Sequence, residues 1–211
     1  MNKVLERPGV MEGLRIPVME QFLTLQGEGF HTGLASWFIR VGGCDVGCHW
    51  CDVKESWDPE IHPLTSVDDI TPQFSTSSPG VVVITGGEPL MWNMDPLTRR
   101  IKSFGHRTHL ETSGAYPLSG AWDWICLSPK KNMKPLSEIY EHCNELKVIV
   151  YNAHDFQFAR EQAAAVRKGT HLFLQPEWSV REKMIPLIIQ FVLENPQWKI
   201  SLQTHKYLGI P

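Results

Sequence analysis

The sequence predicts an α/β protein in which a mainly parallel sheet forms an incomplete, open (β/α) barrel. Short β-branched and apolar runs alternate with helical patterns along much of the chain, an order typical of a parallel sheet covered by helices. The chain has 211 residues, whereas a closed eight-unit barrel typically has about 250. Some connections, such as residues 112–123, are too short for a helix, so we expect the barrel to stay open.

The predicted strands are runs rich in β-branched, aromatic and other apolar residues, which suit a pleated, buried surface. They cover residues 37–41, 81–85, 108–111, 124–127, 146–151, 171–175 and 198–203. Helical patterns cover residues 95–104, 154–168 and 179–194. Ser179 is the expected N-cap of the last helix, and Pro196 lies just past its end. We expect residues 71–80 to form a polar, Pro/Ser-rich linker.

The composition predicts a single domain over residues 1–211, with residues 1–16 as an N-terminal extension. A chain of this length that is 42% hydrophobic can bury a substantial core. With 20 basic and 23 acidic residues the formal net charge is −3, which favours neither nucleic acid nor a membrane surface as a partner. The charged N-terminus lacks the apolar stretch of a signal peptide, and no apolar run reaches the roughly 18 residues of a membrane span. We therefore expect a cytoplasmic protein.

Polar motifs follow the predicted strands at their carboxyl ends. In chain order they are GGCDVGCHWCD (42–52), TGGEP (85–89), ETSG (111–114), SPK (128–130), QPE (175–177) and QTHK (203–206). The carboxyl ends of parallel strands in an α/β barrel form one face, and ligands bind at that face. We therefore expect these motifs to meet in one cavity.

Five cysteines occur in the chain, at positions 44, 48, 51, 126 and 143. An odd number with three members inside eight residues does not resemble a disulfide framework. Converging thiolates repel one another unless a cation lies between them, so the tight group indicates a metal site. Cys126 and Cys143 stand apart in apolar or helical contexts and are expected to be buried core thiols.

Two kinds of metal centre fit three cysteines in one loop. Structural zinc takes four ligands, usually as two separated pairs; here the second pair is missing and His49 is poorly placed to complete a tetrahedron. A 4Fe-4S cluster held by Cys44, Cys48 and Cys51 instead leaves one iron open for a cofactor. We predict the cluster, and keep a zinc-stabilised binding module as the non-enzyme alternative.

The cysteine spacing, C-x3-C-x2-C, resembles the signature of the radical S-adenosylmethionine (SAM) superfamily. Residues 85–89 are similar to the GGEP segment of that superfamily, although the same residues in isolation are also typical of a simple turn. The resemblance implies that SAM chelates the open iron. It further implies that an electron from the reduced cluster cleaves SAM into methionine and a deoxyadenosyl radical.

Over nearly its whole length, the chain also resembles the 7-carboxy-7-deazaguanine synthase family of radical SAM lyases. The matching segments are residues 22–29, 38–40, 48–52, 85–89, 111–114, 128–130, 174–176 and 203–208. The resemblance implies conversion of 6-carboxy-5,6,7,8-tetrahydropterin to 7-carboxy-7-deazaguanine with loss of ammonia, in queuosine and 7-deazapurine biosynthesis. A glycyl-radical activase or another small radical SAM enzyme is the alternative, because it would share the cysteines and GGEP but would not require residues 26–29 or the QTHK tail.

The resemblance also implies roles for individual residues, with no catalytic residue beyond the cluster and SAM. The residues assigned to SAM are Trp50, Asp52, Gly87, Glu88, Ser113, Ser128, Pro129 and Lys130. Those assigned to the pterin are Leu25, Gln26, Gly27, Glu28, Arg40, Thr85, Gln175, His205 and Pro211, the last through the chain's terminal carboxylate. The residue types fit these roles. Arg40 can donate two parallel hydrogen bonds to a carboxylate, and the amide and hydroxyl side chains suit the mixed hydrogen-bond donors and acceptors on the edge of a pterin.

One position departs from the family. The family places Ser or Thr after the Cys-Asp pair to help bind Mg²⁺, and here that position is Val53, which offers no oxygen ligand. We therefore expect weak or absent stimulation by Mg²⁺. The resemblance further implies a homodimer and an electron donor such as flavodoxin, while Lys147 is expected either in the site or on its rim.

Overall fold

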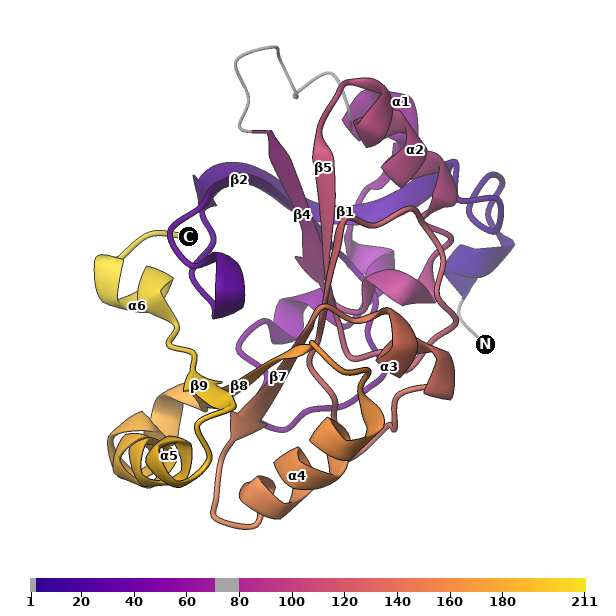
Figure 1. Ribbon diagram of the computed structural model, residues 1–211. Helices are drawn as coiled ribbons and strands as arrows, with labels where there is room; N and C mark the ends of the chain where they lie inside the picture. The colour runs from indigo at the N-terminus through magenta and orange to yellow at the C-terminus, as the bar shows by residue number, and fades with distance from the viewer. Residues whose placement is uncertain (1–2, 71–79) are drawn as a thin grey trace.

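The computed structural model describes residues 3–70 and 80–211, so all but one residue of the expected linker lies outside the described residues. Within the described ranges, nine strands form one sheet in the order β3-β1-β2-β4-β5-β6-β7-β8-β9 (Figure 1). The strands are β1 (Arg15–Leu25), β2 (Ala35–Val41), β3 (Leu64–Ser66), β4 (Val81–Gly86), β5 (Arg107–Thr112), β6 (Trp124–Leu127), β7 (Glu145–Val150), β8 (His171–Pro176) and β9 (Trp198–Ile200).

The parallel part of the sheet runs from β2 through β4 to β9, each strand paired in parallel with the next. Each predicted strand is confirmed within a few residues; the last is shorter than predicted and ends at Ile200. The two ends of the sheet, β3 and β9, are not paired with each other. The expectation of an open, mainly parallel α/β sheet is therefore confirmed.

The sequence interpretation missed β1 and β3. β1 pairs antiparallel with β2 on one side and with β3 on the other. β1 contains Pro17 and several polar residues, so it lacks the composition of a buried strand. It nevertheless pairs along its length with β2, with a register irregularity between Val18 and Glu20. This strand leads directly into residues 26–29, so its register places the first predicted substrate-binding segment.

The described helices are α1 (Val67–Ile70), α2 (Asp95–Ser103), α3 (Ser137–His142), α4 (Asp155–Ala165), α5 (Arg181–Glu194) and α6 (Thr204–Leu208). The three predicted helices correspond to α2, α4 and α5. Ser179 is not the N-cap of α5: it lies in a 3-10 turn (Trp178–Val180), and the Glu177 side chain accepts a hydrogen bond from its backbone N–H. The short helices α3 and α6 have too few apolar residues for a periodic signal.

The helices cover the outer side of the sheet, with α2 against β5, α4 against β7 and α5 against β8 (Figure 1). The apolar core lies between these layers, and both Cys126 and Cys143 are buried as expected. The N-terminal extension joins this core, because Val4 and Val10 are buried in the same cluster as Ile16.

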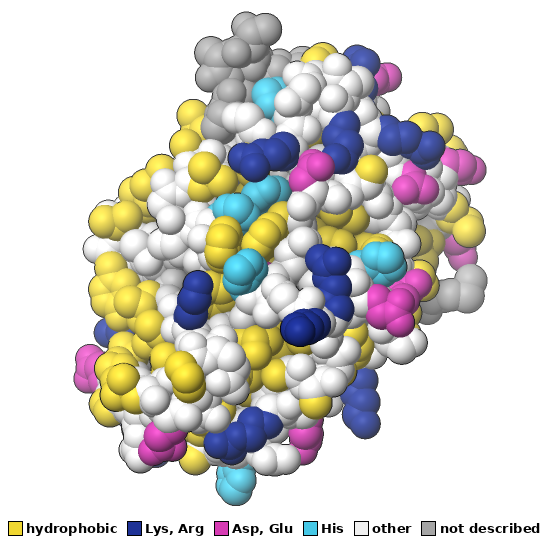
Figure 2. Space-filling view, viewed as in Figure 1, with side chains coloured by type: hydrophobic (Ala, Val, Ile, Leu, Met, Phe, Trp, Pro, Cys, Tyr) yellow, Lys and Arg dark blue, Asp and Glu magenta, His cyan; other side chains and the backbone are white. Residues whose placement is uncertain are grey.

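None of the described helices is long and apolar enough to cross a membrane. On the face seen in Figure 2, Lys and Arg side chains are scattered among acidic and apolar ones and form no continuous basic patch.

Candidate active site

A cavity of about 540 Å³ opens at the carboxyl ends of the parallel strands, where the polar motifs were expected to meet. With one exception, the residues proposed from the sequence line this cavity. They are Leu25, Gln26, Gly27, Glu28, Arg40, Cys44, Cys48, Trp50, Cys51, Asp52, Val53, Thr85, Gly87, Glu88, Ser113, Ser128, Lys130, Gln175, His205 and Pro211. The exception is Pro129, which lines a smaller adjoining cavity of about 120 Å³ together with Cys48, Trp50 and Lys130.

Cys44, Cys48 and Cys51 lie in the loop that leaves β2, and all three are partly buried, free thiols. The backbone of Cys44 donates to the Trp57 carbonyl at 3.1 Å, which ties the loop to the following turn. Burial raises the pKa of Cys44 to about 11, and burial also raises the pKa of Cys48. The neutral thiols are therefore favoured until a cation is bound, and soft thiolate ligands suit iron–sulfur clusters.

Among the described residues, no three His, Cys, Asp or Glu side chains converge in a way that could hold a single metal ion. A 4Fe-4S cluster does not require such convergence, because each cysteine binds a different iron. The three cysteines on one curled loop, facing the cavity, fit that donor set.

The TGGEP segment packs directly against the cysteine loop. The N–H of Gly87 donates to the Val41 carbonyl at 2.9 Å, and the N–H of Glu88 donates to the Gly43 carbonyl at 2.7 Å. A Cβ on Gly87 would overlap the carbonyl oxygen of Gly43 and approach the Cβ of Cys44. The glycine therefore makes room for the neighbouring loop as well as facing the cavity.

Glu88 is 1% exposed and its carboxylate holds two loops together. It accepts hydrogen bonds from the Leu90 N–H at 3.1 Å, from Thr112 Oγ1 at 2.5 Å, and from the N–H and Oγ of Ser113 at 2.8 and 2.5 Å. Both oxygens are engaged within the protein, so the geometry gives Glu88 a role in bracing the GGEP loop against the end of β5. A contact of Glu88 with SAM, expected from the sequence, stays a prediction.

Lys130 and Asp52 both line the cavity, and each makes hydrogen bonds to other side chains. Lys130 Nζ donates to the carbonyl and the Oγ of Ser128 at 2.7 and 2.6 Å and lies 5.5 Å from the centre of the Trp50 ring. Burial lowers the pKa of Lys130. Burial tends to raise the pKa of Asp52, but the hydrogen bond from Lys206 Nζ at 2.7 Å outweighs it and the pKa is lowered.

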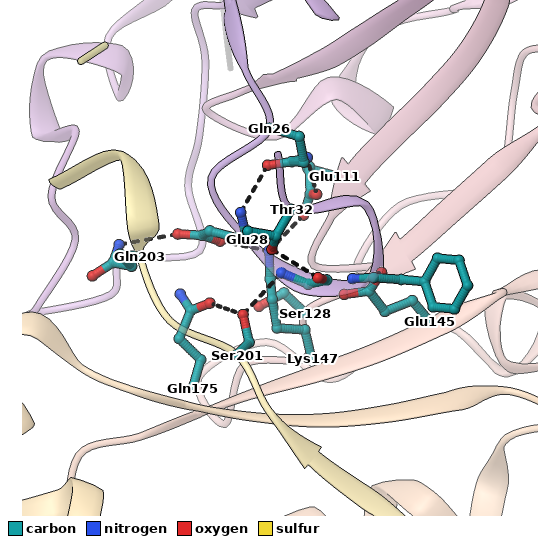
Figure 3. A network of polar contacts seen from close by, with 12 residues as sticks. Gln26, Glu28, Thr32, Glu111, Ser128, Glu145, Lys147, Gln175, Ser201 and Gln203 are labelled. Carbon is teal, nitrogen blue, oxygen red and sulfur yellow. Dashed lines mark hydrogen bonds and ion pairs between the residues drawn. The ribbon is translucent and has the colours of Figure 1, made fainter. Parts of the chain in front are cut away.

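The cavity lining also includes a polar network centred on Lys147, which is 3% exposed (Figure 3). Its Nζ lies 2.6 Å from Glu28 Oε2 and 2.9 Å from Glu111 Oε2. Gln203 Nε2 donates to Glu28 Oε1 at 3.1 Å, and Gln26 Nε2 donates to Glu111 Oε1 at 3.3 Å. The structure thus places Lys147 inside the site and not on its rim.

Arg40 lines the cavity, with its Nε donating to Glu20 Oε1 at 2.6 Å and its guanidinium 5.8 Å from the centre of the Phe22 ring. This ion pair holds the Arg40 side chain of β2 against Glu20 of the neighbouring strand β1. Gln175 is held in a similar way, because its Oε1 accepts from Ser201 Oγ at 2.7 Å.

The C-terminal segment closes one side of the cavity, and α6 lies beside the segment that follows β1 (Figure 1). The N–H of Thr204 donates to the Gly27 carbonyl at 2.8 Å, and a Cβ on Gly27 would overlap the ring of His205. Thr24 Oγ1 donates to the Pro211 carbonyl oxygen at 3.3 Å, so the end of the chain lies at the cavity mouth.

Several lining residues were not assigned a role from the sequence. Glu111, Gln203 and Lys206 lie within the ETSG and QTHK motifs, so a signal for them was present. Trp178 lies in a 3-10 turn after β8, and nothing in its sequence context indicated that it faces the cavity.

Comparisons with known proteins agree with this geometry. The radical SAM superfamily profile matches residues 38–130. The chain is 59% identical to 7-carboxy-7-deazaguanine synthase from Flavobacterium psychrophilum, over 96% of each chain. It is 50% identical to the 7-carboxy-7-deazaguanine synthase from Synechocystis, over 92% of this chain and 93% of the relative.

Among solved structures, the crystal structure of QueE from Escherichia coli matches with a TM-score of 0.81 and 32% identity, over 93% of this chain and 97% of that chain. Together with the cysteine loop and its cavity, these matches define the chain as a radical SAM enzyme, a class that uses a 4Fe-4S cluster and SAM. The chain belongs to the 7-carboxy-7-deazaguanine synthase family.

Proposed function

We propose that this chain converts 6-carboxy-5,6,7,8-tetrahydropterin to 7-carboxy-7-deazaguanine and ammonia, as a step of queuosine and 7-deazapurine biosynthesis. The observation that carries the proposal is that one cavity brings the cysteine loop to face the network of Glu28, Lys147 and Glu111 and the guanidinium of Arg40. A loop that would hold the radical-generating cluster and a hydrogen-bonding surface for a polar bicyclic substrate, both in one cavity, suit this reaction. Small-molecule sites of this kind are concave, with a few placed polar groups.

The cluster and SAM, when bound, supply a deoxyadenosyl radical that removes a hydrogen atom from the substrate. Cys44, Cys48 and Cys51 would hold the cluster, and Trp50 and Lys130, which line the same cavity, would contact SAM. The remaining residues act by orientation. Arg40 would bind the carboxylate of the pterin through its fork, which keeps the reacting carbon at a fixed distance from the cysteine loop.

The pterin ring would lie against the network of Glu28, Lys147 and Glu111. Its amide and amino groups present N–H donors, for which Glu28 and Gln175 supply oxygen acceptors, while Gln26 supplies both a donor and an acceptor. The C-terminal segment with His205 and Pro211 would cover the bound ring and exclude water from the reacting centre.

We further propose that residues 1–211 form one domain, that the protein works in the cytoplasm as a homodimer, and that a flavodoxin-like protein supplies the electron. The five free thiols suit a reducing compartment. Mg²⁺ is not part of the proposed minimal machinery, because Val53 lines the cavity without offering an oxygen.

The test is an anaerobic assay of reconstituted protein with the carboxypterin, SAM and a chemical reductant. We expect about four iron and four sulfide per chain and formation of 7-carboxy-7-deazaguanine with release of ammonia. Cys48→Ala should lose the cluster and all turnover, whereas Cys143→Ala, which alters a buried thiol remote from the cavity, should keep both. Iron-loaded wild-type protein that cleaves SAM but leaves the carboxypterin unchanged would refute the proposed substrate.

A further inference from the structure

Lys147 connects two carboxylates that come from different parts of the chain. Its side chain is 4% exposed and extends from β7 into the cavity wall, where Nζ contacts Glu28 at 2.6 Å and Glu111 at 2.9 Å (Figure 3). Glu28 follows β1 at the antiparallel end of the sheet, and Glu111 lies on β5 in its centre. One ammonium therefore fixes the relative position of two segments that both face the cavity.

Neutral amides hold the outer oxygens of the same carboxylates. Gln203 donates to the second oxygen of Glu28 at 3.1 Å, and Gln26 donates to the second oxygen of Glu111 at 3.3 Å. The backbone N–H of Glu28 in turn donates to Gln26 Oε1 at 3.1 Å. Because a carboxylate has about four acceptor sites, each group keeps acceptor capacity for a ligand in the cavity.

The balance of charge keeps Glu28 and Lys147 ionised. Burial tends to raise the pKa of Glu28, but the charge of Lys147 and its hydrogen bond outweigh burial and lower that pKa. Burial tends to lower the pKa of Lys147, but the surrounding acidic groups outweigh burial and raise it. The other titratable or charged groups that face this cluster are Glu145 on β7 itself and, from neighbouring elements, Cys126, Asp52, His205 and Lys130.

Glu145 completes the cluster on the side away from the cavity. It lies two residues before Lys147 on the same face of β7, and burial raises the pKa of Glu145 to about 7. Its Oε2 accepts from the Phe30 N–H at 3.2 Å and from Trp124 Nε1 at 3.3 Å. The Nζ of Lys147 contacts Glu28 and Glu111, so these two carboxylates are the ones that it chiefly balances.

We propose that Lys147 is a positioning residue, which holds Glu28 and Glu111 at fixed positions as acceptors for the N–H groups of the bound pterin. The inference rests on the proposed function and assigns this residue a task within it. Without the ammonium, two neighbouring carboxylates would share a like charge, and one of them would take up a proton. A protonated carboxyl group would turn a donor toward the donors of the substrate, so recognition would fail until the pH is raised.

The experiment compares Lys147→Met with wild type by the pH dependence of kcat/KM for the carboxypterin. We expect a loss of about 100-fold near neutral pH, because hydrogen bonds to two charged groups are disturbed. We also expect the acidic limb of the profile to move to higher pH by at least about one unit. Without the ammonium of Lys147, the carboxylates of Glu28 and Glu111 together titrate at higher pH. Most of the loss should appear in KM, and equilibrium binding of the carboxypterin to cluster-free protein should weaken with the same pH dependence.

The matched control is Lys102→Met. This change removes the 2.6 Å ion pair between Lys102 Nζ and Asp123 Oδ1 outside the cavity, and it should leave the pH profile unchanged. SAM cleavage in the absence of the pterin should be the same in wild type and Lys147→Met, which shows an intact cluster site. Should Lys147→Met fail to fold, Lys147→Met/Glu145→Gln removes one buried carboxylate and should show the same shifted limb.

Lys147→Met with the wild-type pH profile and substrate affinity would overturn the inference. Failure of both variants to fold would overturn it too, because Lys147 would then serve the stability of the barrel. Wild-type protein that does not convert the carboxypterin would instead refute the proposed function, so the two failures are distinct.

Discussion

At the scale of single residues, Val53 is the basis for the expectation of weak Mg²⁺ dependence. Its side chain faces the same cavity as Asp52 and Cys51 but consists of carbon and hydrogen only. Mg²⁺ requires oxygen ligands in near-octahedral order. Val53 therefore cannot supply a side-chain ligand to Mg²⁺ in this cavity.

We predict that Val53→Thr gains Mg²⁺ dependence. Wild-type turnover after treatment with a chelator should rise little when Mg²⁺ is added back, whereas the variant should respond at Mg²⁺ concentrations at least about tenfold lower, as expected for a restored ligand. Turnover is measured across a Mg²⁺ titration, with Val53→Ala as the control that changes shape without adding oxygen. Equal, strong stimulation of wild type and Val53→Thr would contradict the prediction.

The sequence indicated which residues line the cavity where a motif fixed their position, but it could not do so where the sheet topology decides. The cysteines, Arg40 and Gln26 lie in recognisable motifs, and all of them line the cavity. Lys147 sits inside an apolar strand with no motif around it. Its place in the site depends on which face of β7 points inward, and that depends on pairing with β6 and β8.

At the scale of elements, the carboxyl-end loops support one another as well as the ligands. The GGEP loop hydrogen-bonds to the cysteine loop, and Glu88 joins it to the end of β5. The family resemblance assigned Gly87 to SAM. A gap for a ligand and a gap for a neighbouring loop both require glycine, so the sequence alone does not separate the two roles. The structure shows that Gly87 has a backbone neighbour at its α-carbon.

We predict that Gly87→Ala destabilises the cysteine loop. The added Cβ would overlap the Gly43 carbonyl, a backbone atom that cannot rotate away, and overpacking of this kind costs about 1–3 kcal/mol. The midpoint of thermal unfolding should fall by at least about 2–4 °C, and the iron retained after reconstitution should fall with it.

Gly80→Ala is the matched control for this prediction, because a Cβ at Gly80 meets nothing within 4 Å. Thermal unfolding followed by circular dichroism and iron analysis of both variants provide the measurement. Full iron content and an unchanged midpoint in Gly87→Ala would show that the two loops do not depend on this close approach.

Element boundaries show the same division between local and tertiary information. The seven strands of the parallel sheet have strong β-branched or apolar patterns and were predicted. β1 was not, because its pattern combines a proline, polar residues and apolar residues, and its strand state comes from pairing with β2 and β3. The short α6 was also missed, since its five residues include no fully buried one.

At the scale of the whole molecule, the N-terminal and C-terminal segments have different roles: the first packs into the core, and the second lines the cavity. The N-terminal extension buries Val4 and Val10 in the core, so it belongs to the stability of the fold. In the C-terminal segment, no residue of α6 is fully buried. The segment nevertheless contacts Gly27 through Thr204, and Asp52 of the cysteine loop through Lys206. Its contribution should therefore appear in ligand binding more than in folding.

We predict that deletion of residues 204–211 leaves the fold and the cluster intact but weakens binding of the carboxypterin. The deletion removes the 2.7 Å contact from Lys206 to Asp52 and the packing of His205 on Gly27, and opens the cavity to water. Loss of hydrogen bonds to charged groups costs about 1.5–3 kcal/mol each, so KM should rise by at least about tenfold, while iron content stays at the wild-type level.

Deletion of residues 209–211 alone distinguishes the contribution of Pro211 from that of α6, and an intermediate KM would give Pro211 a direct share of the binding. A truncated enzyme with the wild-type KM, or one that cannot retain iron, would show that the tail does not act as a cover for the substrate.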